Sequence, residues 1–344
     1  MTEHADHGIP PLQDDYAVPA PSCERPATDA VTDPANSAPT PLQTDPLPSS
    51  SDVISYTVFQ PGEHAQPSYD ALKLPDDLRI SWSWVHLVFF LLSSLASFIV
   101  LPVLVALGVQ AVNHKPQYQF QELAKNPSFL VITQVLCFAA IIFFLYMTLG
   151  VLRGVSFWST VGWRKLNLST SRKIYRPWIF PLIGGGLAIF VAVGGSRVKD
   201  AENAPIEQLF KDPHAALLLM AMAVLIAPLV EETVFRGYLY PLFGRAFAKL
   251  AAHYGADSSR AVRFGMTCGI LLTGLLFGML HGWQLGWNVT LVSLLTLVGV
   301  IFTLARAITG TVLASFLMHL GYNSLIAVIT FFATKGFTVA PPVH

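Results

Sequence analysis

Seven long apolar stretches constrain the fold of this chain more than any other feature. They cover residues 84–109, 129–152, 178–195, 215–232, 264–283, 285–308 and 311–332. A bilayer core of about 30 Å needs roughly 20 apolar helical residues to cross it, and burial in a soluble domain does not account for so many such runs. We therefore predict an all-α fold, a polytopic helical membrane bundle of about seven to eight transmembrane helices. The eighth would be a partly embedded helix over 235–252.

Charge divides the chain near residue 80. Hydrophobic residues make up 53% of the chain and charged residues 12%, against roughly 25% charged in an average soluble domain. Residues 1–80 hold 13 acidic and 3 basic side chains and 13 of the 24 prolines, whereas residues 81–344 hold 8 acidic and 18 basic side chains. The first region is typical of a disordered tail, because it lacks apolar runs that could offset the entropy of ordering. A partner-docking segment is the alternative for this tail.

Basic residues in the loops predict the orientation in the membrane. The loops over 153–177 and 244–263 are rich in Lys and Arg, and short loops of this kind face the cytoplasm. Strict alternation then places the tail inside and the C-terminus outside. We expect a multi-pass protein of the plasma membrane, surrounded by lipid and without a nucleic-acid partner. Within the third stretch, the run Gly184-Gly185-Gly186 would permit close contact with a neighbouring helix.

Two carboxylates and an arginine follow one another at the end of the fourth stretch. Ionisable groups cost about 2.5–3.5 kcal/mol at the bilayer centre on insertion scales, so they are functional candidates. Glu232 and Arg236 are four residues apart, which places them on one helical face as an ion pair. Glu231 lies outside that pair and is free to act as a general base. The alternative is that the helix emerges into interfacial water here and these are ordinary boundary charges.

Two further places carry polar groups of catalytic type. His281 ends the motif FGMLH, and His319 and Asn323 lie four residues apart inside the seventh stretch. The plainer interpretations are an interfacial histidine and a hydrogen-bonded contact between helices. Peptide hydrolysis needs a base that activates water and donors for the tetrahedral oxyanion. The three places together supply both.

The three motifs EExxxR, FxxxH and HxxxN, in this order on successive helices, resemble those of the CPBP family. That family comprises the CAAX prenyl endopeptidases and the bacterial Abi and bacteriocin-processing proteins. The sequence EETVFRGYL, which begins at Glu231, is similar to the family's EExxFRGxL, and the likeness covers about residues 215–332. It implies an intramembrane endopeptidase, CAAX-protease-like, with a peptide or membrane-protein substrate. The implied site residues are Glu231 as water activator, Glu232 and Arg236 in support, His281 at the water or metal site, and His319 and Asn323 at the oxyanion.

A cofactor does not follow from these residues. Glu231, His281 and His319 could form a three-ligand catalytic zinc site with an open position. A glutamate-activated water with a histidine–asparagine oxyanion hole needs no metal. The sequence favours neither, so zinc stays an open alternative.

The depth of the site conflicts with the simplest topology. Glu231 lies 16 residues, about 24 Å, along its helix from the outer side, while His281 lies 17 residues along the next helix from the inner side. A long tilted or broken fourth helix, or membrane entry by residues 235–252, would bring the two to one level.

The sequence thus predicts four parts and one principal function. The parts are a disordered acidic Pro-rich tail (1–80), N-terminal membrane helices (81–213), a CPBP-like catalytic core (214–334) and a short C-terminal tail (335–344). The function is hydrolysis of a peptide bond by a glutamate-activated, alternatively metal-bound, water. The competing hypotheses are a non-catalytic membrane immunity or scaffold protein of the same family, and a transporter with a buried proton relay.

Overall fold

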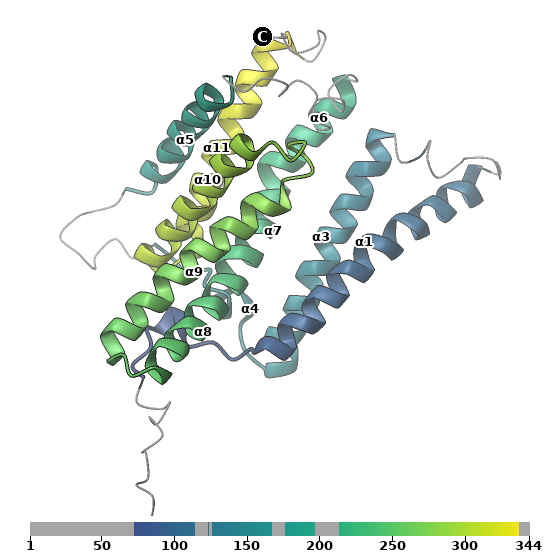
Figure 1. The fold of residues 1–344 in the computed structure, drawn as a ribbon. Helices are drawn as coiled ribbons and strands as arrows, with labels where there is room; N and C mark the ends of the chain where they lie inside the picture. The colour runs from purple at the N-terminus through teal and green to yellow at the C-terminus, as the bar shows by residue number, and fades with distance from the viewer. Residues whose placement is uncertain (1–71, 114–122, 124–125, 167–175, 197–212, 337–344) are drawn as a thin grey trace, which may run out of the picture. The chain divides into compact units, whose positions relative to one another are not determined.

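The computed structural model describes residues 72–113, 123, 126–166, 176–196 and 213–336, and this part of the chain contains helices and loops but no strand. Consecutive long helices run in opposite directions (Figure 1). In chain order they are α1, α3, α5, one long composite helix, α9, α10 and α11. Their bounds are α1 (Trp84–Asn113), α3 (Pro127–Leu149), α5 (Ile179–Gly195), α9 (Ser258–Leu280), α10 (Val289–Thr309) and α11 (Val312–Ala333). Shorter elements are η2 (Asp76–Leu78), η3 (Val151–Arg153) and α4 (Phe157–Thr160).

The composite helix contains two π-helical segments. It consists of α6 (Pro213–Ala221), the π-helix η6 (Met222–Ile226), α7 (Ala227–Glu232), the π-helix η7 (Thr233–Leu239) and α8 (Tyr240–His253). Single π-helical turns inside α-helices occur frequently at functional sites. The two glutamates end α7, directly before η7.

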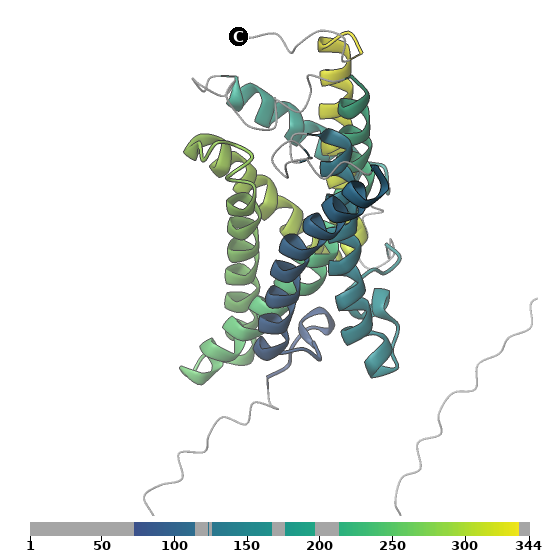
Figure 2. The same ribbon diagram turned by 90° about the vertical axis from the view of Figure 1, so that its right-hand side faces the viewer.

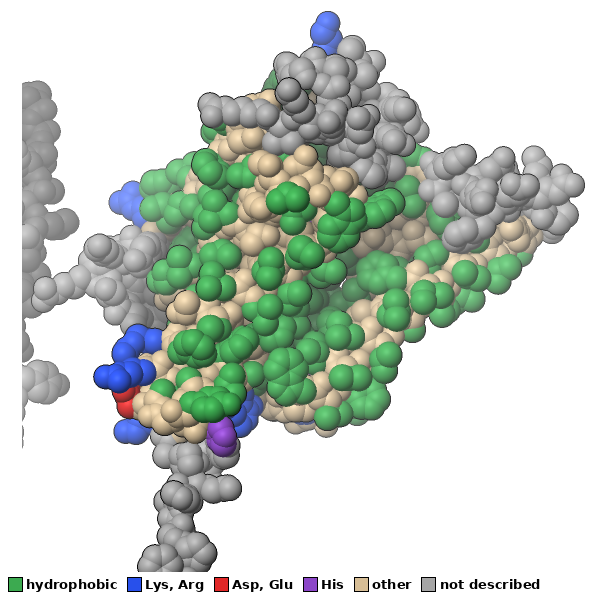
Figure 3. Space-filling model, viewed as in Figure 1, with side chains coloured by type: hydrophobic (Ala, Val, Ile, Leu, Met, Phe, Trp, Pro, Cys, Tyr) green, Lys and Arg blue, Asp and Glu red, His purple; other side chains and the backbone are tan. Residues whose placement is uncertain are grey.

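Six helices in the described part of the chain are long and apolar enough to cross a membrane. They are Trp84–Val112, Pro127–Arg153, Ala216–His253, Ser258–Leu280, Val289–Thr309 and Val312–Ala333. Helix α5 is also apolar but has only 17 residues. In the space-filling view, hydrophobic side chains cover the body, and most Lys and Arg side chains on this face gather at its lower end (Figure 3). The predicted polytopic helical bundle is confirmed, although the third stretch is shorter than a full span.

The fourth span differs most from its prediction, and the difference removes the conflict over depth. It runs for 38 residues from Ala216 to His253, so the expected eighth helix over 235–252 is its continuation. Helix α9 then folds back along α8 after a turn capped by Asp257, whose carboxylate accepts hydrogen bonds from two backbone N–H groups. Glu231 stands 22 residues before His253, and His281 stands 23 residues after Ser258. The two arms of this hairpin therefore differ by one residue, and the 3.9 Å between the side chains of Glu231 and His281 places both residues at one level.

Helices α5 and α11 pack closely side by side, as both ribbon views show (Figures 1 and 2). A Cβ atom at Gly184 would lie 1.8 Å from the backbone oxygen of Met318, and one at Gly321 would lie 2.2 Å from that of Pro181. Only glycine permits so close an approach of two backbones. The close helix contact predicted from the glycine run is present.

Residues 72–82, which we name the strap, cross the end of the bundle near α8 and α10. Leu78 is fully buried, and Arg245 of α8 donates a hydrogen bond to the carbonyl of Ile80. Asp77 forms an ion pair with Arg306 of α10 at 3.4 Å. Residues 72–80 of the predicted tail thus include contacts with the bundle, while the domain boundary at residue 80 stays a prediction. The rest of that tail, residues 1–71, lies outside the described residues.

The predicted orientation stays a prediction. Residues 167–175 and 197–212, which belong to the two loops between α4, α5 and α6, lie outside the described residues. The same holds for residues 337–344 of the predicted C-terminal tail.

Candidate active site

Glu232 and Arg236 form a fully buried ion pair. Nη1 of Arg236 lies 2.8 Å from Oε1 of Glu232, and both side chains are 0% exposed. The guanidinium also donates through Nη2 to the carbonyl of Gly299 at 3.0 Å and through Nε to Oγ1 of Thr303 at 3.3 Å. A buried pair needs such additional hydrogen bonds to offset the loss of hydration. The ion pair predicted from the four-residue spacing is present, and α10 completes it.

Aromatic rings enclose the same guanidinium. Cζ of Arg236 lies 4.5 Å from the ring centroid of Phe277 and 5.4 Å from that of Phe302. A guanidinium within about 6 Å of a ring centroid is attracted by the negative face of the ring. The phenylalanine of the FxxxH motif thus helps to hold the arginine of the EExxxR motif.

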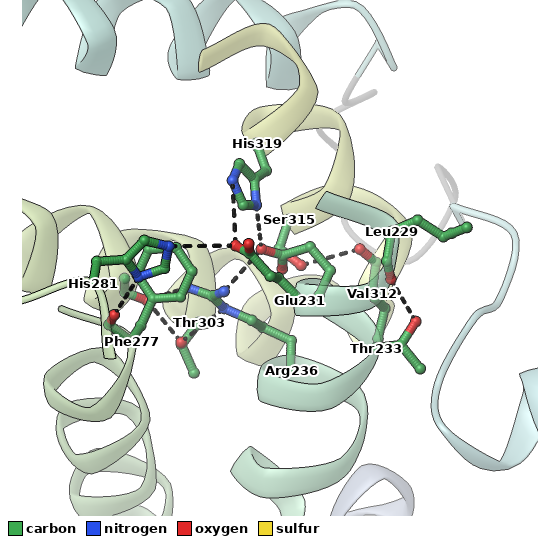
Figure 4. Close-up of polar contacts among 12 residues, drawn as sticks. Leu229, Glu231, Thr233, Arg236, Phe277, His281, Thr303, Val312, Ser315 and His319 are labelled. Atoms are coloured by element: carbon green, nitrogen blue, oxygen red, sulfur yellow. Dashed lines mark hydrogen bonds and ion pairs between the residues drawn. The ribbon is translucent and has the colours of Figure 1, made fainter. Parts of the chain in front are cut away.

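Glu231 faces two imidazoles (Figure 4). Its Oε2 lies 3.9 Å from Nε2 of His281 and 3.8 Å from Nε2 of His319. The side chain of Glu231 is 18% exposed, in contrast to the buried side chain of Glu232. Separations beyond 3.5 Å are those at which a water molecule bridges two polar groups. Glu231 is therefore the more exposed of the two carboxylates.

The other ring nitrogen of each histidine has a fixed partner. Nδ1 of His319 lies 2.9 Å from Oε1 of Glu232, and Nδ1 of His281 lies 2.7 Å from the carbonyl oxygen of Phe277. Because an ionised carboxylate and a carbonyl only accept hydrogen bonds, Nδ1 carries the hydrogen in both rings. Each Nε2 then offers a lone pair toward Glu231 when the ring is neutral, and a proton when it is charged.

Asn323 contacts a π-helical segment. Its amide nitrogen donates to the carbonyl of Ala223 in η6 at 2.7 Å. The second π-helix, η7, also accepts a side-chain hydrogen bond, because Nε1 of Trp82 donates to the carbonyl of Tyr238 at 3.2 Å. The amide of Asn323 has a second N–H that this bond does not use. The residue thus stabilises the π-turn and retains one donor.

The structure brings together five of the six predicted site residues. Four of them, Glu231, Glu232, Arg236 and His319, are linked by contacts of 2.8–3.8 Å, and His281 lies at 3.9 Å. Asn323 comes from the same helix as His319 but has its described hydrogen bond with Ala223. The catalytic roles assigned to all six stay predictions.

The sequence alone does not identify several residues that lie next to the site. Thr303 and Phe302 lie in an apolar stretch, where no spacing signal distinguishes them. Ser315 lies beside Glu232 and donates to the carbonyl of Val312 at 3.0 Å. It precedes His319 by four residues, so the same-face spacing that selected His319 and Asn323 could have found it.

The suggested zinc ligands approach one another without the spacing of a zinc site. Among the described residues, no group of three or more His, Cys, Asp or Glu side chains has an arrangement that could hold a metal ion. The distances of 3.8 and 3.9 Å from Glu231 to the two imidazoles exceed the roughly 3.3 Å between ligand atoms of a tetrahedral zinc with bonds of about 2.0 Å. The residues as arranged do not fit zinc, and the zinc alternative stays a prediction.

Comparison with known proteins gives one family match. The family model described as Type II CAAX prenyl endopeptidase Rce1-like matches residues 213–325. No curated protein and no solved structure matches the chain. The matched segment begins with α6 and ends in α11 two residues after Asn323, so it contains all three motifs, whereas α1, α3 and α5 lie outside it. Residues 213–325 are therefore similar to the Rce1-like type II CAAX prenyl endopeptidases, which is consistent with the CPBP family that the motifs resemble.

Proposed function

We propose that this protein is an intramembrane endopeptidase that hydrolyses a peptide bond with a water molecule activated by Glu231. The proposal rests on the different environments of two neighbouring carboxylates. Glu232 is buried and bound by Arg236 and His319, while Glu231 is partly exposed and faces two imidazole nitrogens. A general base must be reachable by water and free of a competing ion pair. Glu231 is partly exposed, and among the described residues no arginine or lysine forms an ion pair with it.

The arrangement suggests a route for the protons. Glu231 takes one proton from the attacking water as the water oxygen bonds to the substrate carbonyl carbon. That proton passes from Oε2 to Nε2 of His319 or His281 and finally to the leaving amine nitrogen as the C–N bond breaks. The imidazolium that forms at His319 keeps its Nδ1–H on Glu232. The Glu232–Arg236 pair therefore stabilises the ring in both protonation states.

The same imidazolium can serve the oxyanion. A charged His319 presents an N–H at Nε2, and Asn323 retains one amide N–H one helical turn away. Removing one donor of an oxyanion hole costs about 10²–10³ in turnover in a well-studied protease. We assign His319 and Asn323 to this role, with Asn323 also bound to the carbonyl of Ala223.

The substrate is a peptide or a membrane protein presented at the site within the bundle. The match to the family model makes prenylated CAAX proteins one class of candidate substrates. Processing of unprenylated peptides is the other candidate, because the CPBP family that the motifs resemble includes bacteriocin-processing proteins. With either class of substrate, the proposed enzyme is a hydrolase that acts inside the bilayer.

The test compares variants of the two glutamates in the purified full chain. Glu231→Gln should abolish cleavage in a peptide-library screen, with a loss of at least about 10²-fold, while it keeps the wild-type melting temperature. Asp257→Asn is a matched control, because it also neutralises a carboxylate and asparagine still caps α9. Wild-type cleavage by a folded Glu231→Gln protein would contradict the proposal. If the wild type cleaves nothing and Glu231→Gln preserves bacteriocin immunity, the non-catalytic alternative is favoured instead.

A metal requirement is decided by the same assay. Metal analysis of the purified protein is combined with cleavage before and after chelation. Loss of cleavage that only added zinc restores would show a zinc requirement, whereas full activity after chelation would support activation of water by Glu231 without a metal.

A further inference from the structure

A second buried cation, Arg306, lies near the C-terminal end of α10, one turn beyond Thr303. Arg306 is one turn before the end of α10, and its side chain is 2% exposed. It pairs with Asp77 of the strap at 3.4 Å, which is long for a charged hydrogen bond. Its Nε is buried and has no hydrogen-bond partner among the described residues. A buried guanidinium normally satisfies its donors, so this one is under-compensated.

A cavity of about 230 Å³ adjoins this arginine. It lies between the strap, α4 and the end of α10, and its polar lining includes Asp76, Asp77, Arg79, Thr160, Arg164 and Arg306. The buried hydroxyl of Tyr240, which has no hydrogen-bond partner among the described residues, interacts electrostatically with Asp77 and Arg306 but does not line the cavity. An unpartnered buried donor on an arginine that lines this cavity indicates a ligand that accepts hydrogen bonds.

The charges around the cavity favour an anion. Asp76 pairs with Arg79 at 3.2 Å and Asp77 pairs with Arg306. Arg164 adds a positive charge that interacts unfavourably with Arg306. Three arginines thus face two carboxylates. The planar fork of an arginine matches the oxygens of a phosphate in a bidentate manner.

We propose that this cavity binds a phosphate group, held by Arg306 and Arg164, with Asp77 as the competing internal carboxylate. The phosphate comes from the headgroup of an acidic membrane lipid or from free phosphate. The position favours a headgroup, because the cavity lies at the end of a membrane span, near the end of the body where Lys and Arg gather (Figure 3). Acidic lipids attract such basic clusters at the membrane surface. The site is separate from the glutamates and does not depend on the proposed protease activity.

The test measures binding rather than catalysis. Full-length protein in nanodiscs of phosphatidylcholine is titrated with phosphatidylglycerol, and retention is measured by native mass spectrometry. Parallel titrations use inorganic phosphate alone. The variants are Arg306→Gln with Asp77→Asn, which removes the buried pair together, Asp77→Asn alone, and Arg164→Gln. Arg260→Gln is the control, since Arg260 is an exposed arginine at the α8–α9 turn.

We expect wild type and Arg260→Gln to bind phosphatidylglycerol equally. Binding should weaken about tenfold or more in Arg164→Gln and in the double variant, which corresponds to about 1.4 kcal/mol or more. Asp77→Asn should bind more tightly than wild type, because the competing carboxylate is gone. Saturable binding of inorganic phosphate with the same variant pattern, and no preference for phosphatidylglycerol, supports the site with free phosphate as its source. Equal binding by wild type and the double variant, with unchanged melting temperatures, overturns the proposal.

Discussion

Glu231 and Glu232 are neighbours in the chain, yet the side chain of Glu231 is 18% exposed and that of Glu232 is 0% exposed. The helix turns Glu232 toward Arg236 and α10, and it turns Glu231 toward the imidazoles of His281 and His319. One carboxylate is thus a structural acceptor and the other faces solvent. This difference separates the effects of mutation at the two positions.

Glu232→Gln should impair the fold more than Glu231→Gln does. The substitution leaves Arg236 buried without its counter-charge, and breaking a buried pair on one side costs about 3–5 kcal/mol. Glu231→Gln removes no described ion pair with a buried arginine and should change stability by less than about 1 kcal/mol. Thermal unfolding of both variants in detergent, monitored by circular dichroism, compares them. Equal melting temperatures would contradict the assigned difference.

Arg236→Lys should not preserve the site, although it conserves the charge. Arg236 donates to Glu232, Gly299 and Thr303 at once, and an ammonium cannot reproduce that planar fork or its contact with Phe277. We expect a loss of about 2–4 kcal/mol in stability, from lost charged hydrogen bonds of about 1.5–3 kcal/mol each, partly regained by the amine. The exposed pair of Arg260 with Asp257 provides the control, because Arg260→Lys should leave the melting temperature unchanged.

Asn323→Ala should affect both stability and turnover. It leaves the carbonyl of Ala223 without its described donor, which costs about 1–3 kcal/mol. Trp82→Phe removes the corresponding donor to Tyr238 in the other π-helix and is the matched comparison. If Asn323 also serves the oxyanion, its variant loses turnover per folded molecule while Trp82→Phe retains more of it. Equal turnover in the two variants would assign Asn323 to structure alone.

Gly184→Leu should separate α5 from α11. Even the Cβ of a larger residue would meet the backbone of Met318 at 1.8 Å, so the helices must move apart. Overpacking of this kind costs about 1–3 kcal/mol or more. Gly186→Leu is the control on the same helix, because a Cβ there meets nothing within 4 Å. Melting temperatures that fall equally in both variants would contradict a specific role for the contact with α11, because leucine has a higher helix propensity than glycine.

The sequence by itself determined the class of fold and the residues of the candidate site. Apolar runs of about 20 residues leave few structures other than membrane helices, because a bilayer offers no partner for exposed backbone groups. Helical spacing of four residues was enough to predict that Glu232 pairs with Arg236. The scarcity of ionisable groups in the spans singled out His281 and His319, since each such group is costly there.

Only the tertiary structure decided the level at which these residues meet and which partners hold them. The depth of Glu231 relative to His281 depends on the length of the α8–α9 hairpin, and the sequence alone left a long fourth helix and a separate helix over 235–252 as alternatives. Thr303 and Gly299 reach Arg236 from another helix, and Ala223 takes the amide of Asn323, because packing brings together groups that are far apart in the chain. Local periodicity reports which face a residue lies on, whereas the partner on the opposite helix is determined by the packing of the whole bundle.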